Sequence, residues 1–248
     1  MSERRVIGFD RELRLEWLDA VASRAAAGDT PETVRPWLND HLADALGGKG
    51  RSGNRGKTVT VLTRIWVNVP SRCVPLRNRA LGLLTAGDAS DRLALHWAMA
   101  SAVYPFFAEV VTVVGRLLAL QGEVERQAVI RRVVEAWGDR PAVSRGCRAV
   151  WTSVKGWGVL DEGNKRGLYT RRAAPLRPSP AVQGLLLDAL TTNAERPHTP
   201  LREVVSLPGL FPFAVDATRH AMGAIGAHPL VTVRTVSDEF TPSTRQRR

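Results

Sequence analysis

The sequence predicts a mainly α-helical protein with a winged helix-turn-helix at its centre. Apolar residues recur at helical spacing along most of the chain before Gly156. Between Gly122 and Arg172, two helical patterns are followed by hairpin-like residues, and basic residues gather in the same stretch. We expect a helical part with a basic Gly-rich loop at 1–104, a winged-helix module at 105–178, a small α+β part at 179–240 and a basic disordered tail at 241–248.

The composition is that of an ordinary globular chain with an excess of positive charge. Hydrophobic residues make up 44% of the 248 residues, and 35 Lys and Arg against 24 Asp and Glu leave a net charge of +11. An arginine-rich coding composition explains many arginines but not this excess, which favours an anionic partner. Cys73 and Cys147 lie far apart without metal-ligand spacing, so we expect no disulfide, metal or cofactor, and a cytoplasmic location.

Two amphipathic helices are expected at the N-terminus. The apolar spacing predicts the first over 10–27, and Gly28 ends it. Thr30 and Pro31 open the second helix, which is expected to continue to Leu46. Threonine is a favoured N-cap residue and proline a favoured first helical residue, so this start is well marked.

Asp and Glu are absent between Ala45 and Gly87, whereas basic residues are frequent there. Residues 47–56 are rich in glycine and predict a loop, which is either a mobile arm that contacts phosphates or simply a solvated loop. Residues 58–69 include alternating valines that suit a strand, but the longer periodic pattern favours a helix, with another at 76–86. The basic residues of this interval are Lys49, Arg51, Arg55, Lys57, Arg64, Arg72, Arg77 and Arg79.

Gly56, Lys57 and Thr58 match the end of a phosphate-binding P-loop motif. That motif also requires a glycine at the position of Arg51 and a buried strand before the loop. The sequence predicts a helix before the loop instead, so we expect no nucleotide binding by this segment.

Residues 88–103 and 105–120 are strongly apolar and predict two buried helices. A membrane span across 93–115 is not expected, because Pro105 divides this stretch and polar side chains interrupt it. His96 has no second histidine or cysteine nearby in sequence. We therefore interpret it as a hydrogen-bonded core residue and not as a ligand or base.

The winged module is predicted from helix boundaries and from a basic helix face. A helix over 123–137 ends at Gly138, and Pro141 opens a third helix that ends near Gly156. Residues at helical spacing divide this third helix into an apolar face and an opposite face that is polar and basic. The apolar face consists of Val143, Cys147, Val150, Trp151 and Val154. The opposite face consists of Ser144, Arg145, Arg148, Thr152 and Lys155.

A short basic hairpin is expected after the third helix. A strand begins at Val159, turn residues occupy 161–167, and 168–170 can pair back. Its basic residues are Lys165 and Arg166 at the tip and Arg171 and Arg172 at the base. The stretch 140–177 holds nine Lys and Arg and two Asp and Glu, a net charge of +7. A helix fits the major groove and a basic hairpin reaches the backbone, so this favours DNA contact; a solvated face or a protein contact is the alternative.

The C-terminal part is less regular. Residues 173–180 are rich in proline and predict a stiff linker, after which a helix begins at Pro180. A helix over 214–225 and a strand over 230–236 are expected next. The tail at 241–248 is polar and basic, and is expected to be disordered.

The sequence contains no linear motif for catalysis. Its five histidines are scattered without ligand or base spacing, and no serine lies in a nucleophile elbow. We expect a non-enzymatic protein; a site assembled from distant residues is the alternative.

Four short motifs stand out within 14–170. They are Leu95-His96-Trp97, Tyr104-Pro105-Phe106-Phe107, Val114-Gly115-Arg116-Leu117 and Trp157-Gly158-Val159-Leu160. With the run of helices around them, they resemble the BrxA family of bacterial bacteriophage-exclusion (BREX) defence systems. The resemblance implies a cytoplasmic, mostly helical, DNA-binding accessory protein without catalytic residues, and it assigns no role to 201–240.

These observations together favour a largely sequence-tolerant protein that binds double-stranded DNA without catalysing a reaction. Other proteins of the same defence system are further candidate partners, and no membrane partner is expected. The alternatives are a winged-helix transcription regulator and a scaffold that docks on a larger defence enzyme. The residues expected to contact DNA are Ser144, Arg145, Arg148, Thr152, Lys155, Lys165, Arg166 and Arg171, together with Arg51, Arg55, Lys57 and Arg64 of the acid-free interval.

Overall fold

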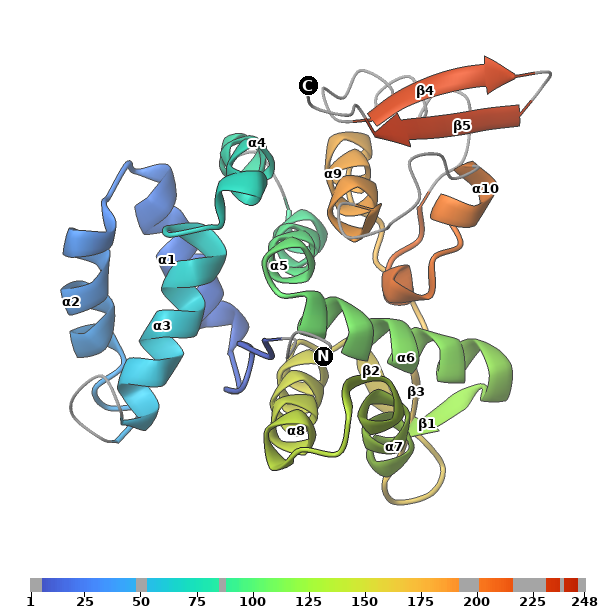
Figure 1. Cartoon of the computed structure of the whole chain (residues 1–248), viewed down its shortest axis with the longest axis horizontal. Coiled ribbons are helices and arrows are strands. Elements are labelled where there is room, and N and C mark those ends of the chain that lie inside the picture. The colour runs from blue at the N-terminus through green and yellow to red at the C-terminus, as the bar shows by residue number, and fades with distance from the viewer. Residues whose placement is uncertain are drawn as a thin grey trace.

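A computed structural model shows a mainly helical chain, as the sequence predicts. It describes residues 6–47, 53–84, 88–191, 201–215, 231–236 and 239–244. Over these residues the helices are accompanied by one three-stranded sheet and one strand pair. The N-terminal helices lie to one side of the central α5, the three-stranded sheet lies below it, and the C-terminal strands lie above it (Figure 1).

Three N-terminal helices pack against one another: α1 (Leu15–Ala26), α2 (Pro31–His41) and α3 (Asn54–Trp66). The helix expected over 58–69 is confirmed, although it begins earlier, at Asn54, and ends earlier, at Trp66. The expected bounds of the other two are wrong at one end. The first helix does not begin at 10, because the backbone is still extended at Arg14, and the second stops at His41, where a turn replaces its last expected residues.

The central helices carry a large part of the apolar core. They are α4 (Val74–Leu84), which follows the 3-10 turn η1 (Ser71–Cys73), α5 (Ala89–Val103) and α6 (Pro105–Gln121). The carboxylate of Asp88 caps α5 by accepting a hydrogen bond of 2.9 Å from the backbone N–H of Asp91. Among the described residues, no single helix has the length and apolar character needed to cross a membrane. Among these residues, only α5 and α6 taken together have that length and apolar character, and the pair is bent by 119° at Tyr104.

The segment after α6 forms a helical pair with a small antiparallel sheet. Its elements are β1 (Glu123–Glu125), α7 (Arg126–Trp137), α8 (Pro141–Gly156), β2 (Leu160–Glu162) and β3 (Leu168–Arg171). The strand order is β1-β3-β2, with Val124 opposite Tyr169 and Asp161 opposite Thr170. The expected helix start at 123 is therefore wrong. Residues 123–125 form a strand because β3 offers a free edge with which they pair, and Val124 becomes buried.

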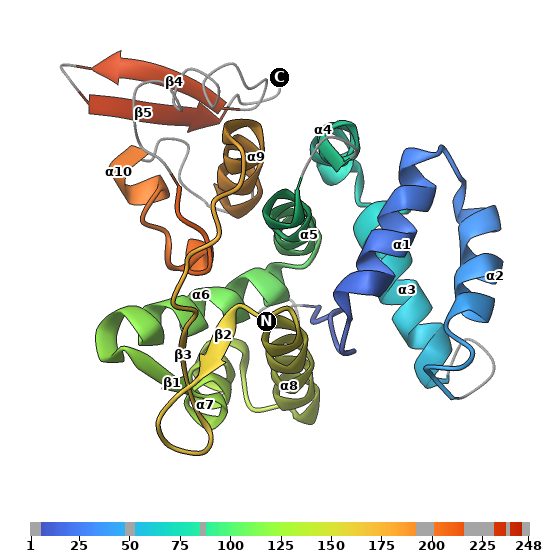
Figure 2. The same ribbon diagram turned by 180° about the vertical axis from the view of Figure 1, so that it is seen from behind.

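The N-terminal segment, residues 6–14, connects the N-terminal helices with the part of the fold that contains α8. It lies between α1 and α3 on one side and α8 on the other (Figure 1, Figure 2). The ring of Phe9 packs against Phe107 with centroids 5.2 Å apart, and Ile7 lies against Gly146 of α8. A side chain at position 146 would clash with both Ile7 and Phe106, so glycine allows this close approach.

The C-terminal part docks on α4, α5 and α6. Its elements are α9 (Pro180–Thr191), α10 (Leu201–Val204), the 3-10 turn η2 (Pro208–Leu210), β4 (Val231–Val236) and β5 (Glu239–Thr244). The helix at 180 and the strand near 230 are confirmed. The tail prediction is wrong for 241–244, because these residues pair with β4 in an antiparallel ladder. The helix expected over 214–225 falls almost entirely outside the described residues.

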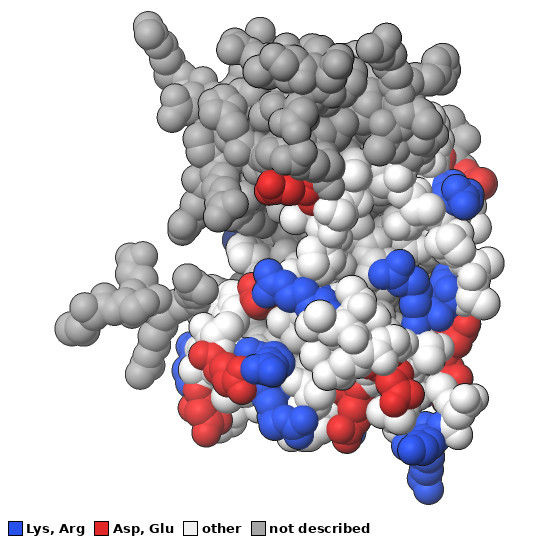
Figure 3. All heavy atoms as spheres, turned by 90° about the vertical axis from the view of Figure 1, so that its right-hand side faces the viewer, with Lys and Arg blue, Asp and Glu red and all other residues white. Residues whose placement is uncertain are grey.

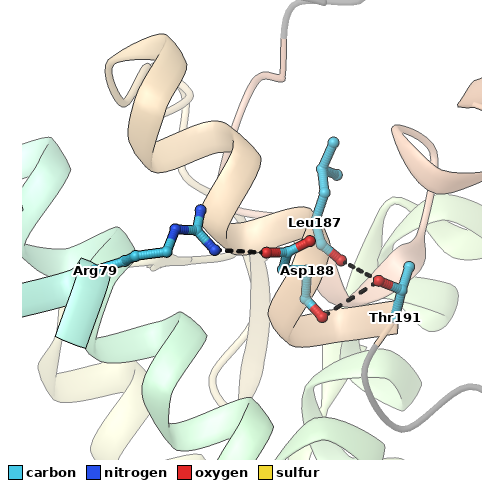
Figure 4. A network of polar contacts seen from close by, with 4 residues as sticks. All are labelled: Arg79, Leu187, Asp188 and Thr191. Atoms are coloured by element: carbon cyan, nitrogen blue, oxygen red, sulfur yellow. Dashed lines mark hydrogen bonds and ion pairs between the residues drawn. The ribbon is translucent and has the colours of Figure 1, made fainter. Parts of the chain in front are cut away.

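Two polar contacts fix the C-terminal part on the helices. Figure 4 shows Arg79 of α4 pointing to Asp188 of α9, where its Nη1 lies 2.8 Å from the carboxylate. Asp188 is 2% exposed, so this ion pair is buried on its acidic side. The indole N–H of Trp97 in α5 donates a hydrogen bond of 3.0 Å to the carbonyl of Gly209 in η2.

Candidate nucleic-acid interface

The apolar face predicted for the third helix is the buried face of α8. Val143, Val150 and Val154 are fully buried, and Cys147 and Trp151 nearly so. This face packs on α6 and α7. The helix begins at Pro141 and ends at Gly156, as the sequence predicts. The apolar spacing thus decides which face of α8 is buried and leaves the opposite face toward solvent.

Arg145 and Arg148 are exposed on that opposite face. Within the described part of the chain, neither guanidinium makes a hydrogen bond or an ion pair. Thr152 is half-buried, and its hydroxyl donates to the carbonyl of Arg148 at 2.9 Å. Ser144 is half-buried as well. The two arginines are therefore the charged groups of this face that remain available to an anion.

Lys155 is exposed on α8, as expected, but its ammonium group contacts the hairpin. Its Nζ lies 3.3 Å from Glu162 of β2 and 2.9 Å from the hydroxyl of Tyr169 on β3, above whose ring it sits at 4.8 Å. Hydrogen bonds to Tyr169 and Glu162 raise the pKa of Lys155. The lysine thus connects the end of α8 to the hairpin, where Trp151 also packs against Tyr169. It orders the hairpin and is only partly available for an external anion.

The hairpin carries basic side chains at the expected places. Lys165 and Arg166 are exposed in the turn between β2 and β3, and Arg171, also exposed, ends β3. Gly167 has φ of +88°, a conformation that favours glycine, so it closes the turn. The carboxylate of Asp161 accepts a hydrogen bond of 3.0 Å from the backbone N–H of Ala173, which holds the base of the hairpin.

A groove of about 340 Å³ runs beside the exposed face of α8. Arg145, Arg148 and Thr152 form one wall, and the N-terminal segment and the start of α3 form the other. The other wall includes two acidic and two basic residues, Asp10, Arg11, Glu12 and Arg14, and also Asn54 and Thr58. Sequence reasoning missed this groove, because its walls come from parts of the chain more than 80 residues apart.

The loop expected at 47–56 is wrong for residues 54–56, which belong to α3. Arg55 lies in α3 and is 8% exposed, because the helix begins at Asn54 and turns this side chain inward. Lys57 is exposed on α3, whereas Arg51 falls outside the described residues. Arg64 is exposed too, but it lines a second cleft, away from the α8 groove. The structure thus brings the start of α3, and not the whole interval, close to α8.

The near match to a P-loop lies inside a helix. Gly56, Lys57 and Thr58 belong to the first turns of α3, and the hydroxyl of Thr58 donates to the carbonyl of Asn54 at 3.0 Å. No strand is found among the described residues 6–47. A backbone loop of the kind that surrounds phosphates is therefore not formed by these three residues.

Charge is mixed on the side of the molecule at the end of α6. Figure 3 views this side, the right-hand side of Figure 1, and shows basic and acidic side chains next to one another on its described surface. Arg132 and Glu135 of α7 form an exposed pair of this kind at 3.2 Å. Because opposite charges alternate, this side does not present the uniform positive field that attracts phosphates over a large area.

His96 is a hydrogen-bonded core residue, as the sequence predicts. The indole N–H of Trp66 lies 3.1 Å from its Nδ1, and the carboxylate of Asp19 lies 2.9 Å from its Nε2. Since an indole only donates, Nδ1 accepts and Nε2 carries the proton that is donated to Asp19. This hydrogen bond lowers the pKa of Asp19. Both ring nitrogens are engaged, so the imidazole has no lone pair left for a base or a metal.

No group of three or more His, Cys, Asp or Glu that could hold a metal ion occurs within the described ranges.

Comparison with protein-family models, with curated proteins and with solved structures finds no match for this chain. What the chain binds must therefore be inferred from its own residues. Free positive charge gathers on the exposed face of α8 and on the neighbouring hairpin.

Proposed function

We propose that residues 105–171 form a winged helix that binds double-stranded DNA, and that the chain is a non-enzymatic accessory protein. The order α6, β1, α7, α8, β2, β3, with β1 paired to β3, supports this assignment. In helix-turn-helix proteins the second helix of the motif enters the major groove. Here that helix is α8, and the single observation that carries the proposal is its exposed pair of unengaged arginines, Arg145 and Arg148.

The proposed binding is largely tolerant of DNA sequence. The exposed face of α8 offers two arginines, a threonine and a serine, and the hairpin adds Lys165, Arg166 and Arg171. Side chains of these types contact phosphates readily, and phosphate contacts carry no direct sequence information. The face has no Asn or Gln, the residues that pair with adenine in the major groove. A net charge of +7 over 140–177 supplies the general attraction.

The biological setting of the proposal rests on the resemblance of the sequence to the BrxA family. On that basis the protein acts in the cytoplasm as part of a BREX-like phage-defence system, with other proteins of the system as partners. The groove beside α8 lends some weight to the scaffold alternative. Asp10 and Glu12 lie on its far wall beside Arg11 and Arg14, and a wall with both signs of charge suits a protein surface better than a phosphate backbone.

The salt dependence of binding tests the proposal. The dissociation constant for a random-sequence duplex is measured by fluorescence anisotropy between about 50 and 200 mM salt. If about six phosphates are contacted, the slope of log affinity against log salt is near −5, at about −0.9 per contact. A flat dependence, or no binding at the lower salt, contradicts DNA binding and favours the scaffold. Protection of one short site in footprinting favours the transcription regulator.

A further inference from the structure

A second cleft, of about 740 Å³, borders Val6 and Gly8 of the N-terminal segment. One wall comes from α3 and η1, with Val61, Arg64 and Arg72. The other comes from the start of α6 and the end of α7, with Glu109 and Trp137. Small-molecule sites have volumes of about 300 to 1,000 Å³, mostly apolar walls and a few polar groups. The cleft has these properties.

Two guanidinium groups give this cleft its positive side. Arg64 is exposed and, among the described residues, makes no hydrogen bond or ion pair. Arg72 is held in place, since its Nη2 donates to the carbonyl of Ala102 at 3.2 Å. Both arginines line the same cleft, and their charges oppose the rise that burial causes in the pKa of Cys73.

The rest of the cleft is apolar apart from a few hydroxyls and one carboxylate. Val61, Val103, Pro105 and Ala108 provide aliphatic surface. Glu109 is the acidic residue of the lining, so the two arginines leave a net positive charge. An anion at the arginines gains charge-assisted hydrogen bonds, while an uncharged body attached to it covers the aliphatic surface.

We infer that this cleft binds a small organic anion with an apolar body. Its carboxylate, sulfonate or phosphate group lies at Arg64 and Arg72, and its body lies against Val103 and Ala108. Arg72 is pre-oriented by its hydrogen bond to Ala102, which lowers the cost of ordering the site. This inference does not depend on the proposed DNA binding, because no residue of the cleft belongs to the exposed face of α8.

The test uses the full chain and the fluorescent anion 1-anilinonaphthalene-8-sulfonate as probe. The bound dye is displaced with 1-naphthoate and, separately, with 1-naphthylmethanol, which has nearly the same shape but no charge. We expect naphthoate to displace the dye at concentrations at least about tenfold lower, because a charged hydrogen bond contributes about that much. Arg64→Gln weakens the binding of naphthoate by about tenfold and leaves the binding of naphthylmethanol unchanged. The matched control is Arg116→Gln, an exposed arginine of α6 outside the lining, which changes neither.

A second variant tests whether the competitors bind in this cleft. Ala108→Phe puts a ring into this space from a half-buried position, so it blocks both competitors while the protein still melts cooperatively. Equal displacement by naphthoate and naphthylmethanol overturns the inference. So does an equal loss on Arg116→Gln and Arg64→Gln, or unchanged naphthoate binding by folded Ala108→Phe.

Discussion

The indole N–H of Trp157 donates a hydrogen bond of 2.8 Å to the carbonyl oxygen of Leu13, which lies 144 residues earlier in the chain. The backbone N–H of Leu13 in turn donates to the hydroxyl of Ser153 at 2.8 Å. α8 and the residue after it therefore satisfy both backbone polar groups of one buried residue. The orientation of α8, and with it that of Arg145 and Arg148, depends on the N-terminal segment.

Ser153→Ala tests this dependence. The substitution leaves the buried N–H of Leu13 without its acceptor, and a loss of about 1–3 kcal/mol in the free energy of unfolding is expected. Urea denaturation measures it. Thr152→Ala is the matched control, because that hydroxyl is half-buried and contacts only its own helix, so a change within about 0.5 kcal/mol is expected. Equal losses of stability in the two variants would show that the hydrogen bond between Ser153 and Leu13 contributes no more than the bond of Thr152 within α8.

Replacing Arg145 and Arg148 together by alanine tests the proposed DNA face. Both side chains are exposed, so the melting temperature stays close to that of the parent. Affinity for duplex DNA falls, and the log–log salt slope becomes shallower by about 1.8 if each arginine contacts one phosphate. Arg131 and Arg132, exposed on α7, provide the control pair with the same change in net charge. A similar loss in the control pair would mean that total charge, and not α8, determines binding.

Much of the fold could be predicted from the sequence where the signal is local. The bounds of α8 follow from Pro141 and Gly156, and its buried face follows from apolar residues at helical spacing. β1 could not be predicted, because three residues become a strand only when the edge of β3 is beside them. Similarly, glycines around Arg55 indicate a loop, and only the packing of α3 on α1 and α2 turns that arginine inward.

The pH dependence of stability tests the buried ion pair in Figure 4. Burial raises the pKa of Asp188 from its ordinary 3.8 to about 7, although the charge of Arg79 lowers it. Between these values the folded state keeps a proton that the unfolded state has lost, so stability falls as pH rises and becomes level above about 7. Asp188→Asn cannot titrate. We expect the parent to lose at most about 4 kcal/mol relative to this variant across the window, at about 1.4 kcal/mol per unit.

Urea denaturation of both proteins between about pH 4 and pH 8 measures this difference. The comparison between parent and variant cancels the contributions of other titrating groups, including Asp19, whose pKa is lowered and whose effect has the opposite sign. Parallel stability curves for the two proteins would contradict a raised pKa at Asp188.

Gly115→Ala tests the docking of η2 on α6. A Cβ atom at this position would lie 1.9 Å from the carbonyl oxygen of Pro208, so the two backbones must separate. Overpacking of this kind costs about 1–3 kcal/mol. Gly82→Ala makes the same change in α4 where nothing lies within 4 Å, and removing a helical glycine there stabilises by about 1 kcal/mol. Thermal melts of the two variants should move in opposite directions, and a stabilised Gly115→Ala would refute the close contact.

The position of residues 6–14 has a consequence for the order of folding. They are made before their partners Ser153 and Trp157, which follow about 140 residues later in the chain. Helices form within about a microsecond from local contacts, whereas joining such distant residues is slow because a long loop must close first. We expect α1, α2 and α3 to assemble early, while residues 6–14 have not yet docked on α8. The last contacts to form are then those that set the direction of α8.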